Sequence, residues 1–96
     1  MQGEYNPQPK DLSHVELPED LMALVELMAE YNHDVWGRGK MNKGYVFGPV
    51  TSDEEMTHKD LIPYPSLTEE SKQYDRNTSL GALRLIHDLG FKIVKA

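Results

Sequence analysis

The stretch from Leu17 to Tyr45 constrains the fold more than any other, because it carries a long helical pattern. Pro18 is favourable in the first turn of a helix, and the two acidic residues after it suit the positive end of the helix dipole. Apolar residues then recur at helical spacing. They predict one buried stripe made of Leu21, Leu24, Val25, Met28, Tyr31 and Val35. We therefore expect a helix over residues 18–39, weakened near its end by two glycines.

A tryptophan and a basic cluster lie at the end of this predicted helix. Trp36 is the only tryptophan in the chain and follows His33 by three residues, so both side chains lie near one helix face. Arg38, Lys40 and Lys43 come next, with no acidic residue between them. Two interpretations stay open: a local anion-binding site, and a solvated positive helix end that complements its own dipole.

The composition excludes several classes of protein. Ninety-six residues support one small core, so we expect a single domain over residues 1–96. A net charge of −6 argues against general nucleic-acid binding, which depends on Lys and Arg neutralising phosphates. The absence of cysteine excludes disulfides, thiolate catalysis and Cys-ligated zinc. No apolar run approaches the roughly 20 residues that span a bilayer, and no signal-peptide core is present, so we expect a cytoplasmic protein without a membrane segment.

The flanking segments predict an extended arm and short strands. Residues 5–17 contain two prolines, which favour an extended arm on the domain surface, and residues 1–4 are expected to be disordered. Tyr45–Phe47 has the composition of a short strand, and its natural partner is the alternating segment Phe91–Lys95. Residues 60–64 are expected to pair only at a sheet edge, because they contain a proline.

A second helical region is predicted between Ser66 and Gly90. Ser66 and Glu69 have capping-box spacing, and Gly90 is a natural helix-terminating residue. We expect a break near Asn77 and Thr78, because both residue types favour caps over helix interiors. With the first helix and the short strands, this pattern predicts an α+β fold.

The chain carries no recognisable catalytic arrangement. Ser13 and His14 are adjacent on the arm, and Ser79 and His87 are too far apart for helical contact, so neither pair makes a triad. Paired acids such as Asp53 and Glu54 are loop charges. We therefore expect no enzymatic activity.

Metal binding is also disfavoured by the spacing of ligand-type residues. Glu30, His33, Asp34 and His58 carry ligand groups, but they match neither an H-E-x-x-H helix nor an EF-hand loop. We expect no bound metal and no cofactor. His33 is instead expected to form a hydrogen bond that fixes the helix end against His58 or the Pro63–Tyr64 turn.

Six short motifs follow one another along the chain, and their order is more specific than any one of them. They are Y-x-P-x-P-x-D-x-S-x-V-x-L-P (5–18), A-E-x-x-H-x-x-W-G (29–37), G-Y-x-F-G-P-V (44–50), H-x-x-L-x-P-Y-x-x-L (58–67), K-x-Y-D-R-x-T (72–78) and L-G-F-x-I (89–93). This succession resembles the RyR domain, the repeat of ryanodine receptor calcium channels that also occurs as free-standing or fused copies in bacteria and phage. The resemblance covers residues 5–94. It implies a bacterial or phage-type copy with two principal helices and short antiparallel strands, and it does not imply a channel.

The resemblance also carries a functional expectation. Bacterial RyR domains look like accessory sensor modules in nucleotide-signalling systems, which favours a nucleotide-derived small molecule as the ligand. An aromatic ring would stack on the base, a second aromatic would form the opposite wall, and basic side chains would meet a phosphate. The candidate ligand-binding residues are Trp36, Tyr45, Arg38, Lys40, His33 and His58. The open alternative is that the Trp36 ring only completes the core.

A second hypothesis is a structural protein-interaction module. Tandem members of the family pack two copies about a pseudo-two-fold axis, so a single copy could restore that arrangement as a homodimer. Exposed apolar residues of the arm or of the final strand would supply the contact.

Overall fold

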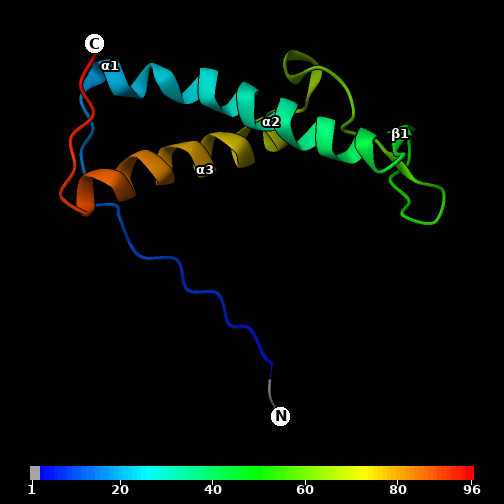
Figure 1. Cartoon of the computed structure of the whole chain (residues 1–96), viewed down its shortest axis with the longest axis horizontal. Coiled ribbons are helices and arrows are strands. Elements are labelled where there is room, and N and C mark those ends of the chain that lie inside the picture. Colours follow the sequence, from blue (N-terminus) through cyan, green and yellow to red (C-terminus); the bar gives the residue numbers. More distant parts are fainter. Residues whose placement is uncertain (1–2) are drawn as a thin grey trace.

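The computed structural model describes residues 3–96 and shows an α+β chain with two long helices and one small sheet (Figure 1). Its elements, in chain order, are α1 (Glu19–Met22), α2 (Leu24–Asn42), β1 (Val46–Phe47), β2 (Thr57–His58), the 3-10 helix η1 (Tyr64–Ser66) and α3 (Glu69–Asp88). The disorder expected for residues 1–4 falls in part on residues 1 and 2, which lie outside the described residues. Within residues 3–96, no helix has both the length and the apolar character needed to cross a membrane.

The first predicted helix, over residues 18–39, is present but longer. It consists of α1 and α2, separated by Ala23, whose φ of −66° and ψ of −19° are still helical. The two glycines near residue 38 do not end it, and α2 runs to Asn42. It ends there because Gly44 adopts a φ of +98°. The backbone N–H groups of Gly44 and Tyr45 then donate hydrogen bonds to carbonyl oxygens of the last helical turn.

Half of the residues predicted to form the buried stripe of this helix are exposed, so that part of the prediction is wrong. Leu24, Tyr31 and Val35 are exposed by 38, 68 and 54%. The inward face is instead centred on Ala29 and His33, whose exposed fractions are 0 and 7%. The prediction failed because apolar residues occupy two opposite sides of the helix, and periodicity alone does not say which side α3 covers.

The second predicted helix is the unbroken α3. Its N-cap is Thr68, whose Oγ1 accepts a hydrogen bond from the Ser71 N–H at 3.2 Å, so it starts after the predicted capping box at Ser66. The expected break at Asn77 and Thr78 is wrong. Both side chains are satisfied within the helix, because Asn77 accepts from the preceding turn and Thr78 donates to a carbonyl oxygen one turn back. The helix terminates before Gly90, as predicted, where φ is +95°.

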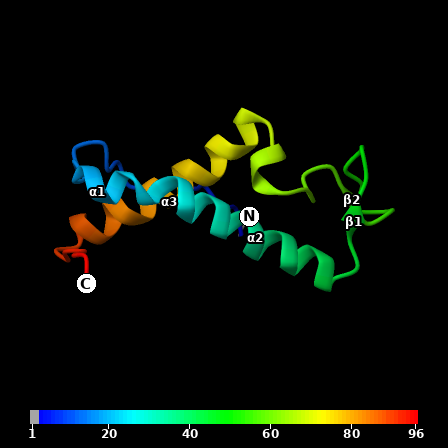
Figure 2. The ribbon, with the colours of Figure 1, turned by 90° about the horizontal axis from the view of Figure 1, so that it is seen from above.

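α2 and α3 cross each other and enclose a small core (Figures 1 and 2). Ala29 of α2 packs there against Tyr64 and Leu67, with Ile62 partly buried beside them. Polar contacts also join the two helices: the Asn32 side chain donates to Ser79 Oγ at 2.9 Å, and a bidentate ion pair links Arg76 to Glu26. The Arg76 guanidinium lowers the pKa of the Glu26 carboxyl through these hydrogen bonds.

The small sheet differs from the expected antiparallel arrangement. β1 and β2 are parallel, with Val46 opposite Thr57 and Phe47 opposite His58. The chain can return in the same direction because residues 49–56 fold back on themselves, and an antiparallel bridge joins Ser52 to Thr57 at the base of this loop. Gly48 is required beside the pair, since a Cβ there would lie 2.7 Å from the Thr57 Cβ.

The predicted final strand does not form. Residues 91–96 adopt no strand and lie beside α1, far from β1 (Figure 1). Ile93 and Val94 line a cavity of about 200 Å³ there with Leu21 and Leu24. Residues 60–64 also form no strand, because Pro63 leads directly into η1. Partners for the C-terminal segment are therefore helical side chains, not a sheet edge.

The N-terminal arm, residues 5–17, contains no helix or strand, in agreement with its prolines. It is attached to the end of α3, where Lys10 and His14 both contact the Asp88 carboxylate. The Lys10 ammonium and then the His14 ring lower the pKa of Asp88.

Candidate functional site

Three aromatic rings gather where the C-terminal half of α2 faces β2. The Trp36 ring centroid lies 5.4 Å from that of His33, with 27° between the ring planes. The His58 ring meets Trp36 edge-on, at 4.7 Å and 77°. The helical spacing of His33 and Trp36 accounts for the first contact, and the short β2 strand delivers His58 for the second.

These rings border a cleft of about 260 Å³, here named the Trp36 cleft. Its lining residues are His33, Trp36, His58, Asp60, Leu67, Ser71, Tyr74 and Asp75. α3 supplies the wall opposite the rings, because Ser71 and Asp75 are four residues apart and share a helix face. The cleft contains two carboxyl groups and no Lys or Arg, so its polar groups suit a ligand that donates hydrogen bonds or carries positive charge.

Hydrogen bonds orient both imidazoles of the cleft. His33 Nε2 donates to the Ile62 carbonyl oxygen at 2.7 Å, which leaves Nδ1 facing Asp75 Oδ2 at 4.0 Å. His58 Nδ1 accepts from the Asp60 backbone N–H at 3.0 Å, so its neutral ring carries its proton on Nε2. His33 therefore contacts the residue just before the Pro63–Tyr64 turn that the sequence predicted as one of its two partners.

The two carboxyl groups of the cleft have different surroundings. Asp60 accepts a hydrogen bond from the Ser71 hydroxyl at 3.3 Å and lies 3.5 Å from the Lys59 ammonium. Asp75 accepts no hydrogen bond from any of the residues 3–96, and His33 Nδ1 lies 4.0 Å from its Oδ2. Burial raises the pKa of Asp75, although nearby His33 acts in the opposite direction. Partly buried carboxyl groups with a raised pKa, located beside a cleft, are common at ligand-binding positions.

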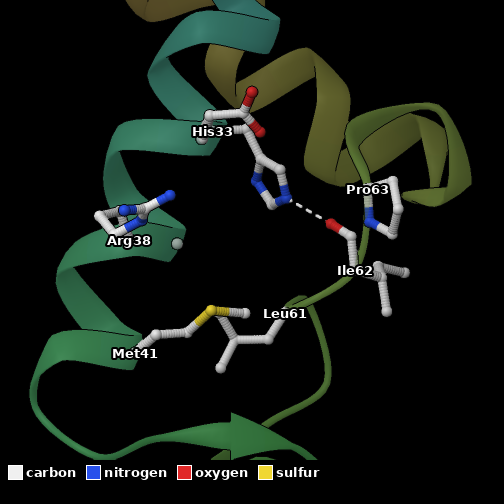
Figure 3. A pocket seen from close by; sticks show the side chains of 8 residues that line it. His33, Arg38, Met41, Leu61, Ile62 and Pro63 are labelled. Atoms are coloured by element: carbon white, nitrogen blue, oxygen red, sulfur yellow. Dashed lines mark hydrogen bonds between the residues drawn. The ribbon is translucent and has the colours of Figure 1, made fainter.

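Arg38 lines a different cavity, of about 450 Å³, here named the Arg38 cavity (Figure 3). It shares His33 with the Trp36 cleft and no other residue. Its remaining walls are Asp34, Gly37 and Met41 of α2 and the segment Leu61–Pro63. Figure 3 shows His33 projecting from α2 to the Ile62 carbonyl oxygen, with Arg38 and Met41 farther along the helix.

Tyr45 and Lys40 form a separate pair. The Lys40 ammonium lies 4.3 Å from the centroid of the Tyr45 ring, which is a cation–π contact. The Tyr45 hydroxyl donates to Asp53 at 2.8 Å, and this bond raises the pKa of Tyr45. Neither side chain lines the Trp36 cleft or the Arg38 cavity.

The structure thus brings together three of the six predicted ligand-binding residues. His33, Trp36 and His58 share one cleft, whereas Arg38 lines the second cavity and Lys40 stacks on Tyr45. The second aromatic wall beside Trp36 is supplied by histidines and not by Tyr45.

The sequence interpretation missed the carboxyl groups of the cleft. The sequence pattern places Asp60 at a sheet edge and Asp75 in the second predicted helix, and it indicates a ligand-binding role for neither. One sequence signal points to Asp75. Ser71, Asp75, Ser79 and Leu83 recur every four residues, so the Asp75 carboxyl group lies on the same face of the helix as the buried Leu83. Within residues 3–96, no three His, Asp or Glu side chains are grouped so as to hold a metal ion.

The fold and the cleft define a small α+β module built on two crossed helices, with an aromatic and acidic cleft at one end. The sequence model of the RyR domain matches residues 5–95 of the 96-residue chain. The chain therefore belongs to the RyR domain family.

Proposed function

We propose that this RyR domain is a non-catalytic module that binds a small planar molecule in the Trp36 cleft. The carrying observation is the grouping of the Trp36, His33 and His58 rings with the carboxyl groups of Asp60 and Asp75. A planar ligand would contact the rings, and stacking on an aromatic side chain contributes roughly 1 to 3 kcal/mol per base. The carboxyl groups would accept hydrogen bonds from amino or ring N–H groups of the same ligand.

This chemistry favours the base of a nucleotide-derived molecule over its phosphate. Purine and pyrimidine edges offer amino and ring N–H donors, which match the two carboxyl groups. A phosphate beside Asp60 and Asp75 would instead meet like charge. Of the two basic residues predicted to meet a phosphate, Arg38 lines the other cavity and Lys40 stacks on Tyr45. We therefore expect a nucleoside or a base-like amine to bind better than the corresponding phosphorylated compound.

The hydrogen bonding of the cleft supports a binding role without catalysis. The Ser71 hydroxyl contacts Asp60 and the Thr68 cap, and no imidazole lies within hydrogen-bond distance of it. His33 Nε2 is occupied by a backbone carbonyl oxygen. A nucleophile activated by a free base is the usual requirement for covalent catalysis, and the Ser71 hydroxyl is hydrogen-bonded to Asp60 and Thr68 instead of to an imidazole.

The proposal is tested by titrating nucleosides and their monophosphates while following the fluorescence of Trp36, the only tryptophan. We expect a neutral nucleoside to bind with a Kd below millimolar and its monophosphate to bind more weakly. Asp75→Asn should weaken binding about tenfold, since it removes a charged acceptor, while Arg38→Ala should leave it unchanged. Absence of nucleoside binding, or dependence on Arg38 in place of Asp75, would contradict the proposal.

A further inference from the structure

The outer face of α2 carries an apolar stripe that the fold leaves largely uncovered, with the C-terminal segment beside its Leu24 end alone. Leu24, Leu27, Tyr31 and Val35 are exposed by 38, 64, 68 and 54%. At 100° per residue they fall within a sector about 80° wide, on the side of the helix opposite to buried Ala29. A helix that is apolar on two sides normally has a partner on each side.

The chain exposes more surface than a compact protein of its mass. Its accessible surface is 7602 Å², whereas a chain of 11.0 kDa is expected to expose about 5,600 Å². Its radius of gyration is 16.4 Å, against about 12.5 Å for a compact domain of this length. The extended arm accounts for part of the excess, and the bare helix face adds to it. A standard interface requires about 800 Å² from each partner.

We propose that this stripe pairs with the same stripe of a second copy, with the two α2 helices antiparallel. An axis between Leu27 and Tyr31 would place each of these residues against the other in the partner copy, and Leu24 against Val35. A two-fold interface requires such self-complementarity, because every contact occurs twice. The cavity at the Leu24 end, which Ile93 and Val94 also line, would receive the Val35 end of the second copy.

Charge complementarity selects the antiparallel direction. Asp20 and Arg38 lie on the same side of the helix as the stripe, at its two ends, and both are exposed. Antiparallel pairing about the same axis places Asp20 of each copy beside Arg38 of the other. Parallel pairing would place each of these charges beside its own equivalent, and like charges facing each other across an interface are unfavourable. The occupant that fits both ends of the stripe is therefore a second copy of this chain.

The mass of the full chain in solution tests this proposal. Sedimentation equilibrium at micromolar to submillimolar concentration should give a species of twice the 11.0 kDa chain mass. Leu27→Glu should weaken dimerisation at least about tenfold, because it places charge in the apolar stripe. The matched control is Val50→Glu, a substitution in a loop residue that is 70% exposed, which should leave the dimer intact. Circular dichroism of each variant verifies that the helices remain folded.

A charge-reversal pair tests the orientation independently of the apolar contacts. Asp20→Arg and Arg38→Asp should each give a monomer, because every copy then faces like charge. Mixing the two variants should restore a dimer, because opposite charges face each other again at both ends of the heterodimer. A monomer at all concentrations, or a dimer insensitive to Leu27→Glu, would overturn the proposal. Failure of the mixture to associate would overturn the antiparallel arrangement. Neither result depends on ligand binding in the Trp36 cleft.

Discussion

The small core makes one pair of leucine substitutions especially informative. Leu83 in α3 is 3% exposed and Leu27 in α2 is 64% exposed, and both lie inside long helices. Leu→Ala therefore removes the same atoms at both sites with the same small gain in helix propensity. Loss of a buried leucine side chain costs about 2 to 5 kcal/mol, whereas an exposed substitution normally changes stability by less than about 0.5 kcal/mol.

The loss of unfolding free energy expected for Leu83→Ala is a large fraction of the total stability of the chain. A chain of 96 residues has an unfolding free energy of about 5 to 14 kcal/mol. Only six apolar residues within 3–96 are buried, so few other contacts compensate for the loss of the Leu83 side chain. At about 3 kcal/mol, Leu83→Ala should lower the Tm by about 12 to 24 °C.

Urea unfolding at low protein concentration, followed by far-UV circular dichroism and by Trp36 fluorescence, measures both variants. The low concentration keeps the proposed dimer dissociated, so that Leu27→Ala reports on the single chain. At high concentration Leu27→Ala should become destabilising while the effect of Leu83→Ala stays large. A loss below about 1 kcal/mol for Leu83→Ala, or equal losses for both variants at low concentration, would refute the assignment of the inner and outer helix faces.

Three further predictions concern Gly48 beside the sheet, the buried His33 and the partly buried carboxyl group of Asp75. Gly48→Ala should destabilise the chain by about 1 to 3 kcal/mol, because the new Cβ would lie 2.7 Å from the Thr57 Cβ. Gly81→Ala in α3 should be stabilising, because a Cβ there has no neighbour within 4 Å. Thermal unfolding compares the two variants, and equal changes in Tm would contradict the close approach at Gly48. His33→Phe should cost about 1 to 3 kcal/mol by leaving the Ile62 carbonyl oxygen without its donor, and an unchanged Tm would show that this bond is not required. Because the folded-state pKa of Asp75 is raised, the wild-type chain loses stability as pH rises from the ordinary value of 3.8 through the raised pKa. Asp75→Asn should therefore have a higher Tm than the wild type at pH 7, and this difference in Tm should shrink as pH falls. A difference that stays constant with pH would exclude the linkage.

The sequence was sufficient for the features that depend on local chemistry. The helical spacing of His33 and Trp36 and the terminating Gly90 act within one or two turns, and the structure agrees with both. Pro18 was predicted in the first turn and lies one residue before it, at the N-cap of α1. The existence of two long helices and of a short strand, predicted over Tyr45–Phe47 and found at Val46–Phe47, follows from the same local preferences.

The features that depend on tertiary packing were not predictable in the same way. α2 has apolar residues on two sides, and only the position of α3 decides that Ala29 faces inward and Tyr31 outward. The parallel pairing of β1 depends on the fold-back of residues 49–56, which no short-range pattern specifies. Asp75 became a candidate ligand-binding residue only when the crossing of the helices brought it to the Trp36 cleft.

His33 is the shared wall of the Trp36 cleft and the Arg38 cavity. Its Nε2 donates a hydrogen bond to Ile62, which lines the Arg38 cavity, and its Nδ1 faces the carboxyl group of Asp75 in the Trp36 cleft. A molecule that displaces Ile62 would therefore also move the imidazole against Asp75. Binding of one ligand in each cavity would then be thermodynamically coupled, and such coupling is reciprocal: any effect of the first ligand on the affinity for the second would be matched by an equal effect of the second on the affinity for the first.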